Sequence, residues 1–542
     1  MMERFWDTPE KLEDLVCELV SWESVYLTQG EAEFPVKLKG LLGELEYFKQ
    51  NPDHLELGEV NWGRTFLTAL YKHEQAEHTV VLISHFDTVS TEDYGVLRPL
   101  STSPRLLTRA LHDRKEMLNE DALKDLESGN YLFGRGVMDM KAGLALHMAL
   151  LEKASTEQWP INLVLLTVPD EEVNSNGMRH AVPTLLEMAD EHDLTYSLFL
   201  NGEPVFAQDP NEQDFKVYTG SIGKIMPSAL FYGKETHVGE PLSGLTSNYM
   251  ASYLTQEMSW NPSFRETLFG ETSPLPVTVL QRDVKMEYSA QTPYRAVSMY
   301  NVFLLERNAE QTMQLFEETA RNALYKMSRD YVEMCTREGI EPVNEVKVFR
   351  FEELKEYALE KLGEKTVEQI MSNVTEDVDH DVREQSHAIT DQLLIQCHEL
   401  TPAVILLFAP PYYPPVNSSE SELVKRCVKQ VQETALGRFD LEVKQGHYFN
   451  GISDLSYVNF QDQNDGWQTY EQNTPVYGRS YSIPFEEMHK LQAPVLNVGP
   501  FGRDAHQRTE RLNRKSAFEE LPVLLEDLLL TQFTPLHTNK YA

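Results

Sequence analysis

Residues 163–177 read LVLLTVPDEEVNSNG, a short apolar run followed at once by three acidic side chains. A run of apolar and β-branched residues that ends at a proline is typical of a strand buried on both faces of a sheet. A second run, VVLIS at 80–84, has the same character, and residues 144–151 between them have helical character. The alternation of such strands with helices, from about residue 10 to 210, predicts an α/β domain with functional side chains at strand ends.

The pattern changes between residues 215 and 412, where strand-like segments alternate with longer helices. A proline-rich break, PPYYPPV at 410–416, precedes a return to the first pattern. We therefore expect one main domain formed by residues 1–214 and 413–542, with residues 215–412 as an inserted α+β domain. Within the insertion, residues 350–400 are charged and mostly helical, which predicts a solvated helical face, with a partner-docking surface as the alternative.

Composition excludes several classes of function. The 48 basic and 85 acidic side chains give a formal net charge of −37, which disfavours nucleic acid and anionic membranes as partners. The 4 cysteines are scattered without a CxxC pair, which excludes a disulfide scaffold and a thiolate zinc site. The acidic N-terminal stretch does not resemble a signal peptide, and no apolar run is long enough to span a bilayer. These features predict a cytoplasmic protein.

Histidine and carboxylate residues follow the predicted strands. His85 and Asp87, in SHFDT, point the same way from a strand end, so one can bind a cation while the other supports it. A purely structural pair is the alternative. Asp139, in GRGVMDMKAG, lies at the mouth of an apolar helix, where a carboxylate can bridge two cations or simply cap the helix.

Three consecutive carboxylates, Asp170, Glu171 and Glu172, follow the strand at 163–168. Burying them is costly unless positive charge balances them, which a pair of cations would do. One glutamate could then bind metal while its neighbour accepts a proton. An acidic helix N-terminus is the alternative.

Two further residues complete the set: Glu203, in LFLNGEPV, and His506, in VLNVGPFGRDAHQRTERL, each follow a predicted strand. Together the five sites supply two histidines and three carboxylates as ligands, with one carboxylate left over as a base. This inventory suits a pair of zinc-like ions.

The ordered motifs SHFDT, GRGVMDMKAG, PDEEVNSNG, NGEP and GPFGRDAH resemble those of the dizinc aminoacylase and carboxypeptidase family, which includes succinyl-diaminopimelate desuccinylase, peptidase T, carnosinase and acetylornithine deacetylase. The likeness covers nearly the whole chain. It implies a three-layer α/β catalytic domain with a zinc-exopeptidase-like mixed sheet, interrupted by an inserted α+β lid or dimerisation domain. The chain's length and acidic insertion further resemble bacterial arginine-utilisation proteins.

The resemblance also implies roles for individual residues. His85 and Glu203 would bind one metal, Glu172 and His506 the other, and Asp139 would bridge both; Glu171 would be the general base and Asp87 would orient His85. In the insertion, GKETHVGEPLSGLTSN places His237 where the family carries a histidine that polarises the scissile carbonyl or stabilises the oxyanion. An ordinary surface histidine is the alternative for His237.

The sequence also departs from the family pattern. The segment NGISDLSY retains Gly451 and Asp454 but lacks the arginine that relatives often use for a substrate carboxylate. Thr509 stands before Glu510 where the family often has an aspartate. Residues 91–130 form an extra polar segment, which we expect near the mouth of the site. His147 and His180 fall on predicted helix faces and are interpreted as structural.

The sequence thus predicts a metal-dependent hydrolase of an amide bond in a small amino-acid derivative: an N-acyl or N-carbamoyl amino acid or a dipeptide, in arginine, ornithine or citrulline catabolism. Two divalent ions, zinc with cobalt or manganese as alternatives, and a homodimer are expected. The rival interpretation is a metal-stabilised binding or regulatory protein without turnover. A missing base or bridging ligand would favour that rival, and neither is missing here.

Overall fold

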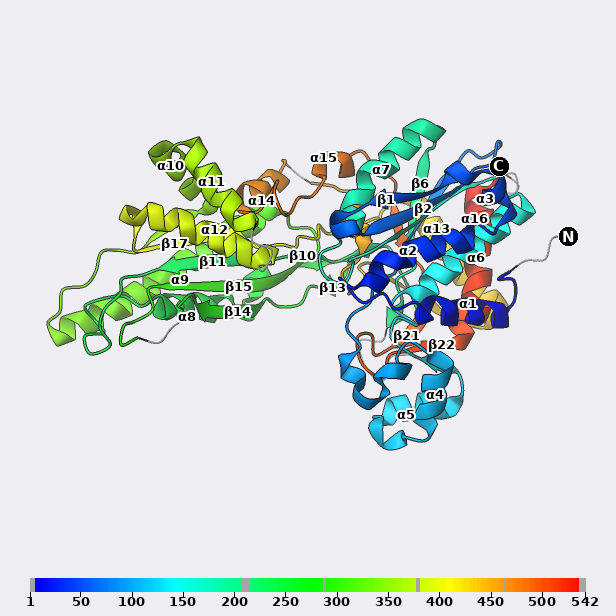
Figure 1. Cartoon of the computed structure of the whole chain (residues 1–542), viewed down its shortest axis with the longest axis horizontal. Coiled ribbons are helices and arrows are strands. Elements are labelled where there is room, and N and C mark those ends of the chain that lie inside the picture. The colour runs from blue at the N-terminus through cyan, green and yellow to red at the C-terminus, as the bar shows by residue number, and fades with distance from the viewer. Residues whose placement is uncertain (1–4, 207–214, 286–288, 377–380, 463, 536–542) are drawn as a thin grey trace. The chain divides into compact units, whose positions relative to one another are not determined.

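The computed structural model describes residues 5–206, 215–285, 289–376, 381–462 and 464–535 (Figure 1). The chain divides into two compact units. The first unit is assembled from three separate segments, Met1–Ser221, Val416–Phe460 and Pro484–Ala542. The second unit consists of Ile222–Pro415 and Gln461–Ile483. Among the described residues, no helix is both long and apolar enough to cross a membrane.

An eight-stranded sheet forms the centre of the first unit. In spatial order its strands are β1 (Leu55–Glu59), β2 (Thr65–Tyr71), β5 (Asn162–Val168), β3 (Thr79–His85), β6 (Tyr196–Asn201), β20 (Val495–Asn497), β8 (Phe215–Tyr218) and β19 (Val443–Gly446). β3 runs parallel to β5 and β6, whereas β2 is antiparallel to β5. The predicted α/β class with a mixed central sheet is therefore confirmed. β8 lies within the stretch predicted as the insertion, yet it pairs with β20 and β19.

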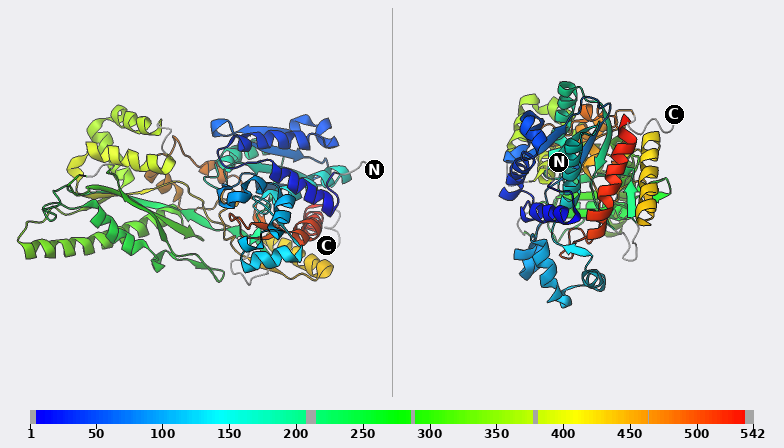
Figure 2. Two further views of the ribbon diagram at one scale, coloured as in Figure 1. Left: turned by 60° about the horizontal axis from the view of Figure 1, so that its bottom comes forward. Right: turned by 90° about the vertical axis from the view of Figure 1, so that its right-hand side faces the viewer.

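Helices cover both faces of this sheet. Apart from α4 and α5, which are described below, the helices of the first unit are α1 (Pro9–Ser21), α2 (Gln29–Leu42), α3 (Glu46–Gln50), α6 (Lys141–Glu157), α7 (Asn176–His192), α13 (Glu422–Phe439), α15 (Phe485–Met488) and α16 (Leu521–Phe533). Alternate residues of β3 and β5, such as Val80 and Leu163, share one hydrophobic core with α1, α6, α13 and α16. α7 contacts β1, β2 and β5 outside that core. α13 and α16, yellow and red in Figure 2, lie side by side.

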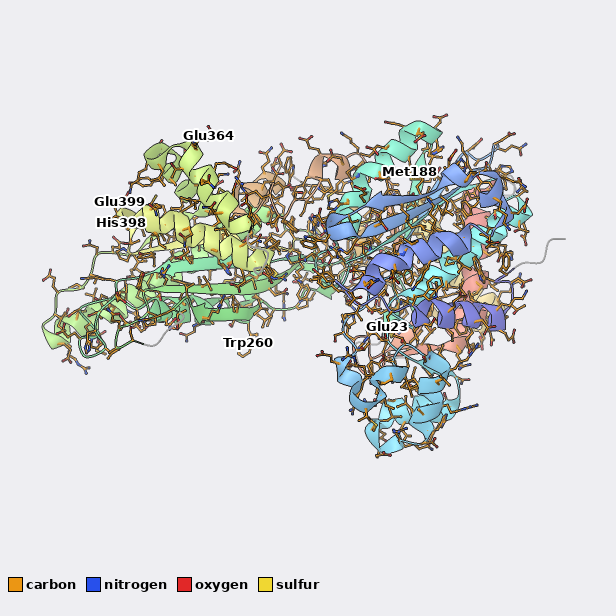
Figure 3. All side chains as sticks on the ribbon, in the orientation of Figure 1. Glu23, Met188, Trp260, Glu364, His398 and Glu399 are labelled. Carbon is orange, nitrogen blue, oxygen red and sulfur yellow. The ribbon has the colours of Figure 1, made fainter. Side chains whose placement is uncertain are left out.

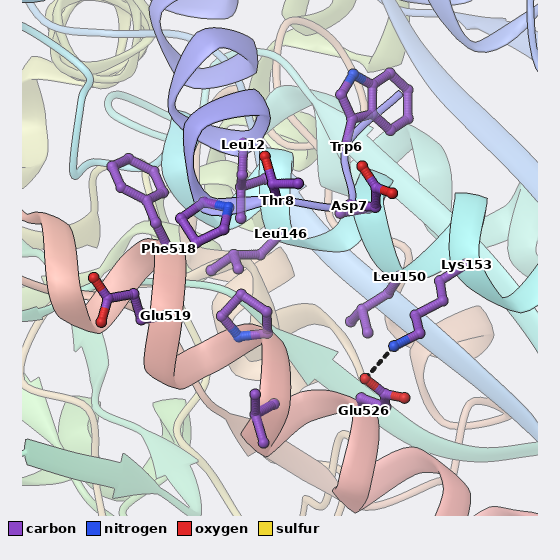
Figure 4. Close-up of a pocket in the computed structure, with 14 residues that line it drawn as sticks. Trp6, Asp7, Thr8, Leu12, Leu146, Leu150, Lys153, Phe518, Glu519 and Glu526 are labelled. Atoms are coloured by element: carbon purple, nitrogen blue, oxygen red, sulfur yellow. Dashed lines mark hydrogen bonds and ion pairs between the residues drawn. The ribbon is translucent and has the colours of Figure 1, made fainter. Parts of the chain in front are cut away.

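Helix α1 illustrates how sequence determines this packing. The Thr8 hydroxyl accepts a hydrogen bond from the Lys11 N–H and caps the helix, and Pro9 occupies the first turn, where its missing N–H is not needed. Leu12, Leu15, Val16 and Leu19 recur at helical spacing and are buried. A shallow apolar pocket lies between α1, α6 and α16, and the Lys153–Glu526 ion pair joins the last two (Figure 4).

A four-stranded sheet and a small helical cluster complete the first unit. The sheet contains β4 (Tyr131–Phe133), β22 (Arg511–Asn513), β21 (Phe501–Arg503) and β7 (Val205–Phe206). Helices α4 (Pro104–His112) and α5 (Glu120–Ser128) enclose a separate small core that includes Leu107 and Leu126. Arg508, two residues after His506, donates a hydrogen bond to the Met117 carbonyl at 2.9 Å. The extra segment 91–130 thus contacts the loop that carries His506.

The second unit contains a six-stranded sheet with helices. Its strands are β10 (Gly223–Ile225), β15 (Arg295–Leu304), β11 (Pro227–Tyr232), β17 (Ala403–Phe408), β16 (Lys347–Arg350) and β14 (Val277–Asp283). Its helices are α8 (Ser247–Met258), α9 (Ala309–Glu338), α10 (Phe351–Leu362), α11 (Glu364–Thr375), α12 (Val382–Gln396) and α14 (Trp467–Asn473). A capping box between Asn308 and Gln311 starts α9. Figure 3 labels Trp260, which follows α8 and is 73 % exposed, and Glu364, His398 and Glu399 of the acidic segment.

Candidate metal centre

Three neighbouring strands bring the predicted ligands to one edge of the main sheet. β3 pairs with β5 so that His85 stands opposite Val168, and it pairs with β6 so that Ile83 stands opposite Asn201. Because these strands are parallel, the residues that follow them emerge at the same edge. Glu171 and Glu203 therefore meet His85, although more than 80 residues separate it from either.

The side chains of this edge converge on Asp139. His85 Nε2 lies 3.2 Å from Asp139 Oδ1 and 3.5 Å from Glu203 Oε1. His506 Nε2 lies 3.1 Å from Asp139 Oδ2 and 2.9 Å from Glu172 Oε2. The two oxygens of Asp139 thus each face one histidine. Glu171 is slightly further away, with its Oε2 3.9 Å from His85 Nε2.

Asp87 supports this arrangement from behind. It is fully buried, and its two carboxylate oxygens accept hydrogen bonds from the backbone N–H groups of Glu171 (3.1 Å) and Glu172 (3.2 Å). Its Oδ1 also lies 3.5 Å from His85 Nδ1. The Asp87 backbone carbonyl, 3.2 Å from Nδ1, accepts the Nδ1 proton, which leaves Nε2 as the ring nitrogen that can bind a metal.

The cluster carries more negative charge than its own histidines balance. Burial raises the pKa of Glu171 well above its usual range; His85 lowers it, and Glu203 raises it further. Burial acts to lower the pKa of His506, but Asp139 and Glu172 outweigh this effect and raise it to about 11. Without a metal, His85 and His506 therefore keep protons that balance the charge of the neighbouring carboxylates. A bound cation would balance the same charge in their place.

A glycine allows the helix behind Asp139 to approach Glu203. Gly143 lies in the first turn of α6, and a Cβ atom at this position would come within 2.2 Å of the Gly202 carbonyl oxygen. No side chain fits there without moving the backbone. The close approach holds the Asp139 loop against the turn that carries Glu203.

Sequence reasoning missed the buried basic residues that support the centre. Arg64, 3 % exposed, lies 3.4 Å from both Asp170 and Glu31. Arg135 pairs with Glu510 at 2.9 Å, and Lys141 donates to the Trp22 carbonyl. Each partner is distant in sequence, so no local pattern indicates these pairs. The only available signal was that acidic residues next to buried strands need counter-charges.

The remaining candidate histidines lie elsewhere. His237 belongs to the second unit, where its Nδ1 accepts a hydrogen bond from the Gly239 N–H at 3.1 Å. Its Nε2 therefore carries the proton in the neutral form. His147 is fully buried on α6, and burial lowers its pKa to about 3. His180 on α7 bonds through Nδ1 to the Asn176 carbonyl, which fits a structural role.

The donor set fits divalent metal ions. Two groups of three side chains offer ligand atoms that all lie within 4.8 Å of one another: His85, Glu171 and Glu203, and His85, Asp139 and Glu172. His506 adds a second imidazole beside Asp139 and Glu172. Imidazole nitrogen and carboxylate oxygen are the ligands that zinc and similar ions take at catalytic sites.

Residues 81–530, well over half of the chain, match the family described as Peptidase family M20/M25/M40. The chain belongs to this family. This M20 protein is 39% identical over 529 residues to YqjN of Bacillus subtilis (strain 168), an alignment that covers 96% of each chain. It is 28% identical over 535 residues to RocB of the same organism, which covers 95% of this chain and 94% of RocB.

Its fold is similar to that of the M20 family metallo-carboxypeptidase Sso-CP2 from Sulfolobus solfataricus, with a TM-score of 0.55 and 13% identity. The match covers 96% of this chain and 98% of the other. M20 membership confirms the resemblance predicted from the ordered motifs. The protein is therefore a metal-dependent hydrolase.

Proposed function

We propose that this M20 protein hydrolyses an amide bond of a small amino-acid derivative at a centre of two divalent ions, zinc or else cobalt or manganese. The observation that carries the proposal is the Asp139 carboxylate, whose oxygens lie 3.2 and 3.1 Å from the Nε2 atoms of His85 and His506. One carboxylate between two imidazoles is suited to a position shared by two cations.

The proposed ligands are His85 and Glu203 for one ion and Glu172 and His506 for the other, with Asp139 shared. When bound, such ions supply Lewis acidity, which polarises a carbonyl and makes a water molecule more acidic. Asp87 would hold the His85 ring and, through its bonds to two backbone N–H groups, the turn that carries Glu171 and Glu172.

Glu171 is the proposed general base. Its backbone is fixed by Asp87, and its carboxylate lies beside the ligands, at 3.9 Å from His85 Nε2. From this position it can accept a proton from the attacking water and pass that proton to the leaving nitrogen. Glu171 also belongs to one of the two groups that could hold a metal, so its role must be tested against that of a ligand.

His237 is proposed to stabilise the oxyanion. The hydrogen bond from Gly239 to Nδ1 leaves the Nε2–H group as a donor for a developing negative charge. This assignment rests on the position of His237 in the motif GKETHVGEPLSGLTSN and on its tautomer, and it applies to either its own subunit or a partner copy.

The test combines metal analysis with hydrolysis of N-acyl amino acids, N-carbamoyl amino acids and dipeptides, with and without a chelator. We expect Glu171→Gln to retain both ions and to lose about 10²–10⁴-fold in turnover. Glu187→Gln, at an exposed position on α7, is the matched control. Loss of metal from Glu171→Gln would make Glu171 a ligand, and near-normal turnover would refute its role as base. Two bound ions without release of amine from any substrate would favour the binding-protein alternative.

Three finer parts of the proposal rest on the sequence arguments: arginine, ornithine or citrulline catabolism, a homodimer and a cytoplasmic location. The proposed place in arginine, ornithine or citrulline catabolism is tested by comparing kcat/KM across the panel, where derivatives of these amino acids should be the best substrates. Light scattering of the eluted protein tests the second; a monomeric mass would refute it.

A further inference from the structure

The loop that carries His506 has an unusual backbone conformation. This His506 loop, residues 504–510, joins β21 to β22. Asp504 and His506 have φ angles of +58° and +62°, in the left-handed region that residues with a Cβ atom rarely occupy. Such a conformation persists where surrounding contacts hold it. The position of the His506 imidazole beside Asp139 and Glu172 therefore depends on what fixes this loop.

One carboxylate joins the two ends of the His506 loop. Oδ2 of Asp504 accepts hydrogen bonds from the Thr509 hydroxyl, at 2.7 Å, and from Nη1 of Arg511. The same Nη1 donates to the Thr509 carbonyl at 3.1 Å. Because Asp504 begins the loop and Thr509 is near its end, these bonds close the loop on either side of His506.

Arg511 depends in turn on a residue of the extra segment 91–130. Its side chain is 1 % exposed, and its Nε donates to Oδ2 of Asp125, on α5, at 2.7 Å. A buried guanidinium requires acceptors for its N–H donors, and these donors lie in one rigid plane. The bond at Nε therefore sets the direction in which Nη1 reaches Asp504.

Two further contacts join the extra segment to the His506 loop. Nη2 of Arg508 donates to the Met117 carbonyl at 2.9 Å. Nη2 of Arg135 donates to both carboxylate oxygens of Asp93, at 2.9 and 3.0 Å, while its Nη1 donates to Glu510 at 2.9 Å. Three separate points of the extra segment thus reach the loop, either directly or through one arginine.

The extra segment is rigid enough to serve as a support. It has a small hydrophobic core of its own, formed with the strand β4 by Tyr94, Leu97, Leu107, Leu111, Ala122, Leu126 and Phe133. Side chains that a packed element carries hold their positions more closely than side chains on an open loop. The contacts made by Asp125, Met117 and Asp93 therefore start from a fixed platform.

We propose that the extra segment fixes the His506 loop and thereby positions His506 as a metal ligand, with Asp125 as the positioning residue. Asp125 orients the Arg511 guanidinium, and that guanidinium holds Asp504. The loop then keeps the conformation that brings the His506 imidazole to Asp139. This inference rests on the proposed metal centre, and it assigns part of the metal affinity to a residue outside the ligand set.

The experiment measures the affinities of the two zinc ions by competition of the full-length protein with a chromophoric chelator. Asp125→Ala removes the acceptor of the Arg511 Nε–H group, and we expect it to weaken one ion about tenfold and to leave the other within about twofold. Asp125→Asn, which keeps an acceptor oxygen, should lose less. Asp121→Ala, which removes the same charge from an exposed position in the first turn of α5, is the control and should change neither affinity.

A second variant keeps the test decisive if Asp125→Ala does not fold. Arg508→Ala removes the bond to Met117 from an exposed position and leaves no buried charge unpaired. We expect it to weaken the same ion by about three- to fivefold. Affinities within about twofold of the unchanged protein in both variants would refute the proposal. Equal weakening of both ions would also overturn it, because it would indicate a general loss of structure.

Hydrogen exchange of the metal-free protein separates this inference from the proposed metal centre. In Asp125→Ala we expect the backbone amides of the His506 loop to exchange at least about fivefold faster, whereas those of β3 should keep their rates. If the unchanged protein binds no pair of ions and this difference is found, the proposed metal centre fails and the positioning of the loop by Asp125 stands. Equal exchange rates in the loop would refute the role of Asp125 whether or not metal binds.

Discussion

Asp87→Asn exchanges one carboxylate oxygen for an NH₂ group and keeps the shape of the side chain. In the structure the two oxygens accept hydrogen bonds from the backbone N–H groups of Glu171 and Glu172, at 3.1 and 3.2 Å. An amide offers one acceptor to these two donors, so one N–H would lose its partner and face the NH₂ group. The same change removes the negative charge 3.5 Å from His85 Nδ1, although the Asp87 backbone carbonyl still accepts a hydrogen bond from that nitrogen.

The size of the effect should depend on whether metal is bound. Loss of a hydrogen bond to a charged acceptor costs about 1.5–3 kcal/mol. The metal-free chain regains part of this cost, because one negative charge leaves a crowded group of buried carboxylates. With metal bound, a shift of the His85 ring and of the turn that carries Glu171 and Glu172 would move the ligand atoms and weaken metal binding. We therefore expect a 10–100-fold loss of metal affinity, or about 1.4–2.7 kcal/mol.

Competition of the purified protein with a chromophoric chelator measures this affinity, and thermal unfolding of the metal-free form measures stability separately. Asp190→Asn, at an exposed position on α7, is the matched control. A metal affinity within threefold of the unchanged protein would refute the role assigned to Asp87. An equally large loss of stability in the metal-free form would show that the residue supports the fold instead.

Three further predictions follow from the same structure. Gly143→Ala should destabilise the protein by about 1–3 kcal/mol in chemical unfolding, because its Cβ would meet the Gly202 carbonyl oxygen at 2.2 Å, whereas Gly40→Ala in α2, with open space around it, should be neutral or stabilising. His387 Nε2 lies 2.7 Å from the Ser228 hydroxyl, and burial lowers the pKa of His387 to about 4 from the ordinary 6.5. Because the unfolded chain takes up this proton at a higher pH than the folded chain, the free energy of unfolding should fall by up to about 3 kcal/mol between pH 6.5 and 4. His387→Gln should make the free energy of unfolding less dependent on pH over the same range. Removal of metal by a chelator should lower the unfolding temperature, and zinc should restore it; an unchanged temperature would contradict a cation requirement of the carboxylate cluster.

The sequence singled out several residues of the candidate centre because they follow a local rule. His85 and Glu203 each stand directly after an apolar run, and neighbouring parallel strands carry such residues to one edge. The α/β class and the family followed from the same motifs, and both are confirmed. Roles such as base and bridge stay predictions, because they depend on a metal and a substrate.

Features that depend on contacts between residues far apart in the chain could not be predicted from the sequence. The pairing of β8 with β20 and β19 depends on which strand edges of the folded sheet are free, and the local sequence at 215–218 does not indicate it. The Arg64–Asp170 pair joins residues 106 positions apart. Asp454 was recognised as part of a motif, but its burial close to Asp87 and Asp170 could not be predicted from the local sequence.

The assembly of the first unit from three chain segments also affects the order of events during synthesis. Glu203 leaves the ribosome 303 residues before His506, which at 5–20 residues per second is a delay of roughly 15–60 s. During that interval the strands that carry His85, Glu171 and Glu203 are complete, whereas the second imidazole and β20 do not yet exist. The nascent chain therefore has an incomplete, acidic cluster next to the edge of β6 that later pairs with β20. A metal site that includes His506 can be completed only when translation is nearly finished.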